Sequence, residues 1–148
     1  MIDLPDIRQQ GEHDCGTTAV RVLLRSLARR VTSGQFSALA CDPVDGTDPR
    51  AIETFLRGVG LRVLSGSMTW ADLITLTASG RPVICLITPS HGIGHYVVVG
   101  SAQQSLVRYQ CPSIGPDMLA RIRWMRQWKE VDRLGAVYHQ WGIAAWRP

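Results

Sequence analysis

Cys15 and His95 constrain the fold of this 148-residue chain more than any other feature. The thiol stands at the predicted start of a helix, because Asp14 is a good N-cap residue and apolar residues follow at helical spacing over 19–27. The histidine opens an apolar strand over 94–99, eighty residues further along. A fold that joins the two makes a cysteine nucleophile with a base, and we expect the helix N-terminus and an imidazolium to lower the thiol pKa.

Capping and turn residues divide the rest of the chain. After a polar connection over 32–45, Asp48 and Pro49 predict a second helix, which glycines at 58 and 60 stop, and Thr69 starts a third that ends at Gly80. Strands are predicted at 61–64, 83–88, 94–100, 105–109 and 142–146, and a further helical stretch begins at Pro116. This order predicts an α+β fold in which a helical N-terminal half packs on a C-terminal antiparallel sheet, as one domain over 1–148.

The composition disfavours membrane-spanning, secreted and nucleic-acid-binding classes of protein. A hydrophobic content of 45% is enough for a buried core, and no apolar run is long enough to span a membrane. The acidic N-terminal segment does not resemble a signal peptide, and the four cysteines include no Cys-x-x-Cys pair, so we expect a cytoplasmic protein. The net charge of +4 comes from fifteen arginines and one lysine, but no nucleic-acid-binding motif accompanies them, which disfavours a nucleic-acid partner.

The candidate site gains a third member in Gln9, whose side-chain amide could join the Cys15 backbone N–H as an oxyanion donor. Each residue also has a structural interpretation. A buried cysteine near a helix start is usually inert, and a histidine at a strand end is usually a hydrogen-bonded core residue. The combination of Cys15, His95 and Gln9 in one chain favours catalysis over these separate interpretations.

Three segments resemble one known family. They are residues 9–20, residues 94–99 and Tyr109-Gln110-Cys111-Pro112, and they are similar to the papain-like peptidases that process bacteriocin leaders after a double-glycine motif. The resemblance implies a papain-like fold, with Cys15 as nucleophile, His95 as general base and Gln9 in the oxyanion hole. The family has an aspartate sixteen residues after the histidine, where this chain has Cys111.

Cys111 leaves three alternatives for the third place of the triad. Cys15 and His95 could work as a dyad, Gln110 or Asp117 could orient the ring after a local shift, or the domain could have weakened into a binding module. A neutral thiol is a poor substitute for a carboxylate beside an imidazolium. Because a thiol is already acidic, a Cys–His site depends less on the third group than a serine site does.

The same cysteines and histidine also suggest a metal set. Cys15, His95 and Cys111, with His13 or His91 as a fourth ligand, are the residue types that bind zinc. In a papain-like site the two outer groups lie on opposite sides of the imidazole, so one ion cannot easily collect all three. We therefore expect neither metal nor cofactor.

The sequence thus predicts a cysteine peptidase that cuts a peptide or protein substrate after small residues such as glycine. The chain has no Gly-x-x-x-x-Gly-Lys nucleotide loop, so any link to a transporter would require a partner protein. Two rival functions stay open: a peptide-binding domain with weakened catalysis, and an acyl-transfer or deconjugating cysteine enzyme.

Overall fold

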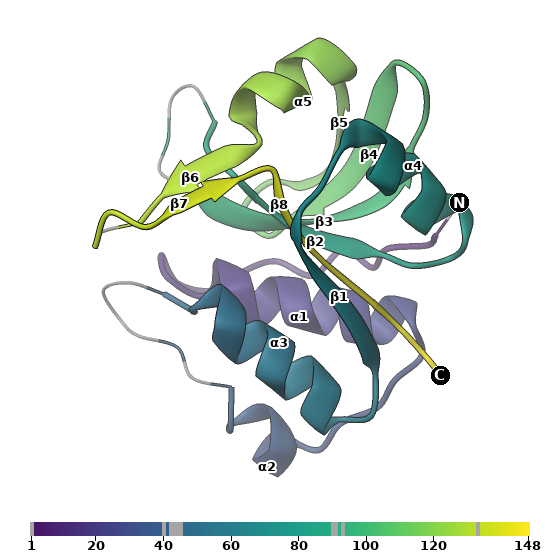
Figure 1. The fold of residues 1–148 in the computed structure, drawn as a ribbon. Coiled ribbons are helices and arrows are strands. Elements are labelled where there is room, and N and C mark those ends of the chain that lie inside the picture. The colour runs from purple at the N-terminus through teal and green to yellow at the C-terminus, as the bar shows by residue number, and fades with distance from the viewer. Residues whose placement is uncertain (1, 40, 42–45, 90–91, 93, 133) are drawn as a thin grey trace.

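The structure is a computed structural model that describes residues 2–39, 41, 46–89, 92, 94–132 and 134–148. Three helices come first along the chain, and strands predominate from β1 onward (Figure 1). The helices are α1 (Cys15–Ser26), α2 (Ser33–Phe36), α3 (Pro49–Gly58), α4 (Trp70–Ala78) and α5 (Arg121–Gln127). The strands are β1 (Arg62–Ser67), β2 (Val83–Ile87), β3 (His95–Ala102), β4 (Leu106–Cys111), β5 (Gly115–Ala120), β6 (Lys129–Val131), β7 (Val137–His139) and β8 (Trp141–Trp146).

Local capping explains where α3 and α4 begin. The Asp48 carboxylate accepts the Arg50 backbone N–H at the start of α3, with Pro49 in the first turn. Thr69 and Asp72 form a capping box at the start of α4. These two starts agree with the sequence prediction. Asp14 is the N-cap of α1, but its side chain makes no cap hydrogen bond, so the predicted capping role of that carboxylate was wrong.

The main sheet has six strands in the order β1-β8-β2-β3-β4-β5, and every described pairing is antiparallel. In the register of β2 with β3, Ile87 stands opposite His95. In the register of β4 with β5, Cys111 stands opposite Gly115. Because β3 and β4 are antiparallel, with Val98 opposite Gln110, the start of β3 and the end of β4 meet at the same end of the sheet.

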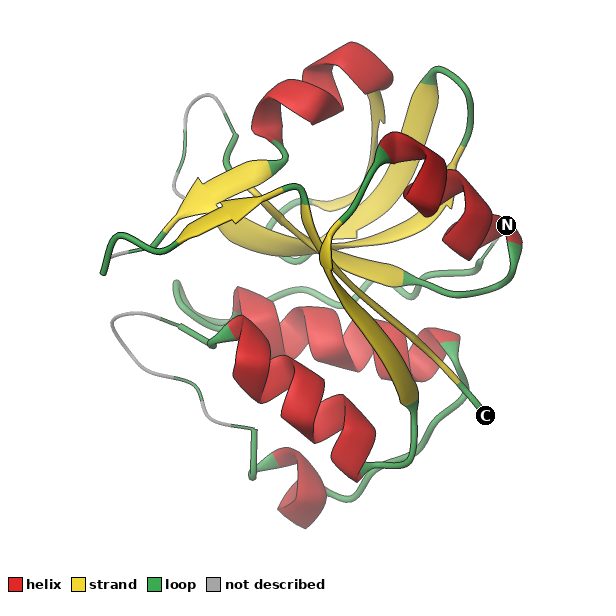
Figure 2. Ribbon diagram, in the orientation of Figure 1, coloured by secondary structure: helices red, strands yellow, loops and turns green. Residues whose placement is uncertain are grey.

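Helices cover both faces of this sheet (Figure 2). On one face, α1 and α3 bury Val20, Leu23 and Leu56 against strand residues that include Val98 and Ile143. On the other face, α4 and α5 bury a second cluster that includes Leu73, Trp124, Val97 and Val99, together with Trp128 just after α5. Because side chains alternate along β3, this strand contributes to both apolar clusters. The mixed fold of helices and antiparallel strands agrees with the predicted α+β class.

One prediction about the chain after β4 was wrong, and two elements were missed. Residues from Pro116 were expected to be helical, but Gly115–Ala120 form strand β5, and helix α5 begins only at Arg121. β5 is the edge strand, where a residue without an N–H can be accommodated because one side has no partner. The β6–β7 hairpin and the short helix α2, inside the expected polar connection, were not predicted.

Among the residues that the structure describes, no helix is both long and apolar enough to cross a membrane.

Candidate active site

Cys15 is the first residue of α1, where the first backbone N–H groups of a helix have no partner inside the helix. The turn before it is held by Asp14, whose carboxylate accepts the backbone N–H of Gln10 (3.0 Å) and Gly11 (2.9 Å). The Cys15 side chain is partly buried against the apolar cluster between the sheet and helices α1 and α3. The segment before α1, residues 2–14, forms a lead-in that together with the helix fixes the position of the thiol.

Tyr96, the residue after His95, connects the start of α1 to the sheet. Its backbone N–H lies near the Cys15 sulfur and favours the thiolate form. Its ring packs on Gly16, where an added Cβ would lie 3.1 Å from Tyr96 Cδ2 and 2.8 Å from Thr47 Cβ. Its buried hydroxyl donates to the Thr47 carbonyl (2.6 Å). Cys15 therefore lies next to the residue that follows His95, at the contact between α1 and β3.

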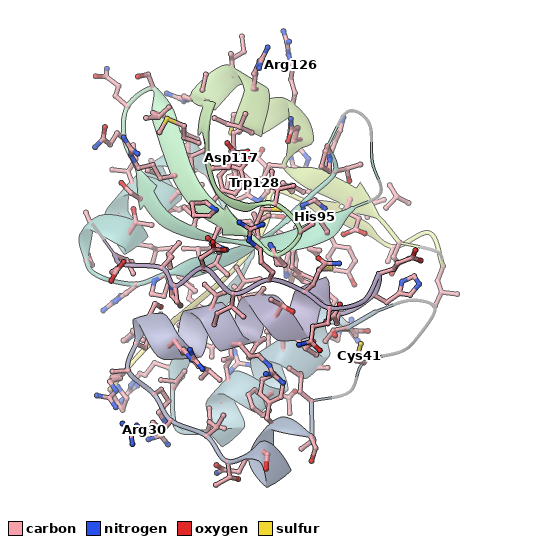
Figure 3. The ribbon with its side chains drawn as sticks, turned by 180° about the vertical axis from the view of Figure 1, so that it is seen from behind. Arg30, Cys41, His95, Asp117, Arg126 and Trp128 are labelled. Carbon is pink, nitrogen blue, oxygen red and sulfur yellow. The ribbon has the colours of Figure 1, made fainter. Side chains whose placement is uncertain are left out.

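His95 opens β3 with its ring next to Cys111 at the end of β4, where Cys111 Sγ lies 3.5 Å from His95 Nε2. Figure 3 shows His95 above the N-terminal end of α1. Because Nε2 faces Cys111, Nδ1 is the ring nitrogen left for a second partner. Among the described residues no hydrogen bond joins Cys15 to His95, although such bonds are often long in ligand-free enzymes.

The two other candidates for orienting His95 are engaged elsewhere. Gln110 is buried and points to the opposite side of β4, where its amide donates to Asp6 (2.9 Å). Asp117 is exposed on β5 and accepts the Tyr109 hydroxyl (3.1 Å). Of the three residues considered for the third position, Cys111 is therefore the one that the structure places against the His95 ring.

Gln9 lies in the lead-in, beside the loop that follows Cys111. Its backbone N–H donates to the Pro112 carbonyl (2.8 Å), and its side-chain amide donates to the Gly11 carbonyl (2.7 Å). A primary amide has two N–H donors, so one is left after the bond to Gly11. Gln9 is thus tied both to the loop before Cys15 and to the segment that follows Cys111.

Comparison with known proteins identifies the family. The sequence matches the model of the Peptidase C39 family over residues 3–132. This chain belongs to the Peptidase C39 family. The match covers most of the chain, so the protein is a cysteine peptidase by family, in agreement with the prediction.

Solved structures agree on the fold of this C39 peptidase. The peptidase domain of Streptococcus ComA, a bifunctional ABC transporter involved in quorum sensing, has a TM-score of 0.73 at 17% identity, covering 99% of this chain and 100% of that one. A double-glycine-motif protease from an AMS/PCAT transporter, in complex with the leader peptide, has a TM-score of 0.68 at 16% identity, covering 98% and 91%. The peptidase domain of Streptococcus mutans ComA has a TM-score of 0.60 at 18% identity, covering 95% and 97%. No curated protein sequence matches significantly.

The thiol groups of this C39 peptidase differ in acidity. Burial raises the pKa of Cys15, while the backbone N–H groups of Tyr96 and Gly16 act in the opposite direction and the Glu130 carboxyl adds to the increase. The expectation of a lowered Cys15 pKa was wrong, because loss of water around the sulfur outweighs the helix start. Cys15 therefore rests as a thiol that needs a base.

The pKa of Cys111, in contrast, is lowered. Burial disfavours its ionised form, but hydrogen bonds from His95, from the Ser113 hydroxyl (3.1 Å) and from the backbone N–H groups of Ile114 and Ser113 lower the pKa of Cys111 to about 7. Close to neutral pH, a large fraction of this thiol is an anion next to the imidazole. Cys111 thus supplies much of the charge that a neutral thiol was expected to lack.

The described residues contain no group of three or more His, Cys, Asp or Glu side chains placed to bind a metal ion. His13 contributes its backbone carbonyl to Cys41 (3.5 Å). His91, the other histidine considered as a ligand, lies outside the described residues.

Two residues near the site were missed by sequence reasoning. Tyr96 could have been found from strand alternation, because the residue after His95 must face the side of the sheet opposite to the His95 ring. Glu130 could not have been found from the sequence, because no motif surrounds it. Only the β6–β7 hairpin brings it near His95.

Proposed function

We propose that this C39 peptidase cleaves a leader peptide after small residues, such as a double glycine, through an acyl-enzyme on Cys15. The substrate class rests on the family and on the double-glycine-motif protease of similar fold that binds a leader peptide. The observation that carries the residue roles is that His95 Nε2 faces Cys111 while the neighbouring Tyr96 N–H reaches the Cys15 sulfur. This leaves His95 Nδ1 as the base for Cys15.

The reaction begins with transfer of the Cys15 proton to His95 Nδ1. The Cys15 sulfur attacks the carbonyl carbon, and the Cys15 backbone N–H and the Gln9 amide donate to the resulting oxyanion. His95 then gives its proton to the leaving amine, and the peptide C–N bond breaks to leave a thioester on Cys15. A water molecule, deprotonated by His95, hydrolyses that thioester and regenerates the thiol.

Cys111 completes the site as the third member in this proposal. As an anion it accepts the His95 Nε2–H, which keeps Nδ1 free to receive the Cys15 proton. The two apolar clusters share one sheet, so we also infer a single peptidase domain over 1–148. A cytoplasmic location, and an additional partner protein that presents the substrate, stay part of the proposal.

The test combines thiol labelling with peptide cleavage. Wild type, Cys15→Ala and His95→Ala are incubated with iodoacetamide and with peptides that contain a double glycine. We expect wild type to cleave after the glycines, Cys15→Ala to be inactive, and His95→Ala to lose roughly 10²–10⁴-fold in rate. Mass spectrometry should find Cys15 labelled faster than the exposed Cys41 in wild type, but not in His95→Ala.

The rival functions predict other results. A binding domain with weakened catalysis would retain a leader peptide without cutting it and would show no His95-dependent labelling of Cys15. An acyl-transfer enzyme would form the thioester but pass the acyl group to an added amine faster than to water. Labelling of Cys15 that is no faster than that of Cys41 would exclude the nucleophile assignment.

A further inference from the structure

Glu130 lies against the residue that precedes His95. It is a half-buried residue of β6, and its carboxyl fills the space in front of Gly94, so that a methyl group built on Gly94 would overlap it. The absence of a side chain at position 94 is what allows this approach. A carboxyl group is thus packed beside the backbone that carries the proposed base.

The backbone around Glu130 is held on several sides. The Thr88 hydroxyl donates to the Lys129 carbonyl (2.6 Å), and the Thr88 N–H donates to the Gln127 carbonyl (2.7 Å). The indole of the buried Trp128 donates to the Trp141 carbonyl (3.0 Å). Across the hairpin, Glu130 is paired with Tyr138 of β7. The carboxyl therefore reaches Gly94 from an anchored strand rather than from a free loop.

Among the residues that the structure describes, the titratable groups that interact with Glu130 include a single base. Those that interact with it electrostatically are Cys15 of α1, His95 and Tyr96 of β3, Tyr138 of β7 and Asp132 of its own hairpin. Within the described part of the chain, no lysine or arginine forms an ion pair with Glu130. Among the described residues, His95 is thus the group that interacts with Glu130 and can become a cation.

We propose that Glu130 is a positioning residue that stabilises the protonated His95 ring formed when Cys15 gives up its proton. This inference rests on the proposed function, because it assigns Glu130 to the same Cys15–His95 pair. The carboxylate acts through space from its place beside Gly94, while Cys111 contacts Nε2. Two acidic groups thereby surround the imidazolium in a chain that lacks the family's aspartate.

The pH range of this effect follows from the environment of Glu130. Burial raises the pKa of Glu130 to about 7, and the neighbouring His95 limits the increase. The carboxyl is mostly neutral below that pH and mostly anionic above it. Glu130 therefore helps His95 to keep its proton in the alkaline range and has little influence in the acid range, where a glutamine would be equivalent.

The test compares Glu130→Gln with Asp132→Asn, which removes the same charge from the same hairpin. The His95 ring is followed by NMR titration of histidine-labelled protein, with His95→Ala used for assignment. We expect the midpoint of the His95 titration to fall by about 0.5–1 pH unit in Glu130→Gln and by much less in Asp132→Asn. Equal midpoints in wild type and Glu130→Gln would overturn the proposal.

Cleavage kinetics provide a second readout that a purely structural role would not reproduce. Because His95 must lose its proton before it can act as the base, the acid limb of the kcat/KM profile should move to lower pH by the same amount in Glu130→Gln. A uniform loss at every pH, with an unchanged His95 titration, would mean that Glu130 only supports the hairpin. The NMR result stands without a substrate, whereas failure of His95-dependent Cys15 labelling would refute the proposed function, so the two failures are distinguishable.

Gly94 supplies a matched geometric control. Gly94→Ala should displace the Glu130 carboxyl and lower the His95 titration midpoint in the same way as Glu130→Gln. In a Glu130→Ala background, Gly94→Ala should add no further shift, because the carboxyl is already gone. Additive shifts in the double variant would show that Gly94 acts on His95 independently of Glu130 and would contradict the packing argument.

Discussion

Cys111 stands where the family resemblance leads to an aspartate, and its surroundings make it more acidic than an ordinary thiol. Four hydrogen bonds, one of them from His95, overcome the effect of burial and lower its pKa to about 7. The sign of the pH dependence follows from this depressed pKa. The anionic form is present above about pH 7 and is lost as the pH falls through that value, so orientation of His95 weakens on the acid side.

Cys111→Asp should therefore extend activity into the acid range. A thiol with a pKa of about 7 is roughly one-tenth ionised at pH 6, whereas an aspartate with an ordinary pKa is almost fully ionised. We expect a gain of up to about tenfold in kcat/KM at pH 6 and a small change at pH 8. Cys111→Ser, which cannot ionise in this range, is the control and should be slower than wild type at pH 8. A Cys111→Asp enzyme without the acid-side gain would mean that the aspartate does not reach Nε2.

Gly16 shows how closely the nucleophile is packed. An added Cβ would lie 2.8 Å from Thr47 Cβ and 3.1 Å from the Tyr96 ring, and both neighbours are buried. Gly16→Ala should shift the start of α1 away from β3 and reduce kcat/KM by roughly tenfold or more. Gly58→Ala, on a helix position with open space, is the matched control and should leave turnover unchanged. Equal kinetics in the two variants would show that α1 tolerates the displacement.

At the scale of elements, the lead-in and α1 act as one unit. Asp14 holds the loop between Gln9 and Cys15 by accepting two backbone N–H groups, instead of capping the helix. The same lead-in reaches the opposite end of the site through Gln9 and the Pro112 carbonyl. The oxyanion donor and the loop after Cys111 are therefore connected by a short extended segment.

A comparison of Asp14→Ala with Asp72→Ala tests whether the loop before Cys15 affects catalysis as well as stability. Both remove a carboxylate that accepts backbone N–H groups near a helix start, and each should lower the free energy of unfolding by about 1 kcal/mol. Only Asp14→Ala should also reduce kcat/KM, by roughly 10–100-fold, because it releases Gln9 and the turn before Cys15. Urea unfolding and peptide cleavage on the same samples measure the two effects. Equal kinetics in the two variants would contradict the role given to this loop.

Local signals predicted the elements that local chemistry determines. Asp48-Pro49 and Thr69 marked the starts of α3 and α4 because capping depends on a few adjacent residues. Pro116 misled the prediction, since proline suits both the first turn of a helix and an edge strand, and only the neighbouring β4 decides between them. The position of Cys111 followed from its spacing to His95, but its acidity depends on N–H groups that only the folded turn brings to the sulfur.

At the scale of the whole molecule, one sheet serves two cores and β8 joins both. Ile143 is fully buried in the cluster under α1 and α3, whereas Ala144, the next residue, belongs to the cluster under α4 and α5. β8 also pairs with both β1 and β2. Loss of side chains on β8 should therefore weaken the entire fold rather than one lobe.

Ile143→Ala should lower the free energy of unfolding by about 2–5 kcal/mol, because a fully buried side chain leaves a cavity. Ile122→Ala, at a position that is 63% exposed on α5, should stay within about 0.5 kcal/mol of wild type. Urea unfolding followed by tryptophan fluorescence and by circular dichroism measures both. Two separate transitions in Ile143→Ala would contradict the view that β8 joins the cores into one cooperative unit.

The central position of β8 also affects when a newly made chain becomes active. A ribosome synthesises Cys15 and His95 well before residues 141–146, so nucleophile and base exist while β1 and β2 still lack the strand between them. The Trp141 carbonyl that holds Trp128, two residues before Glu130, is missing as well. We therefore expect the nascent chain to have no peptidase activity until β8 has been synthesised and has paired with β1 and β2.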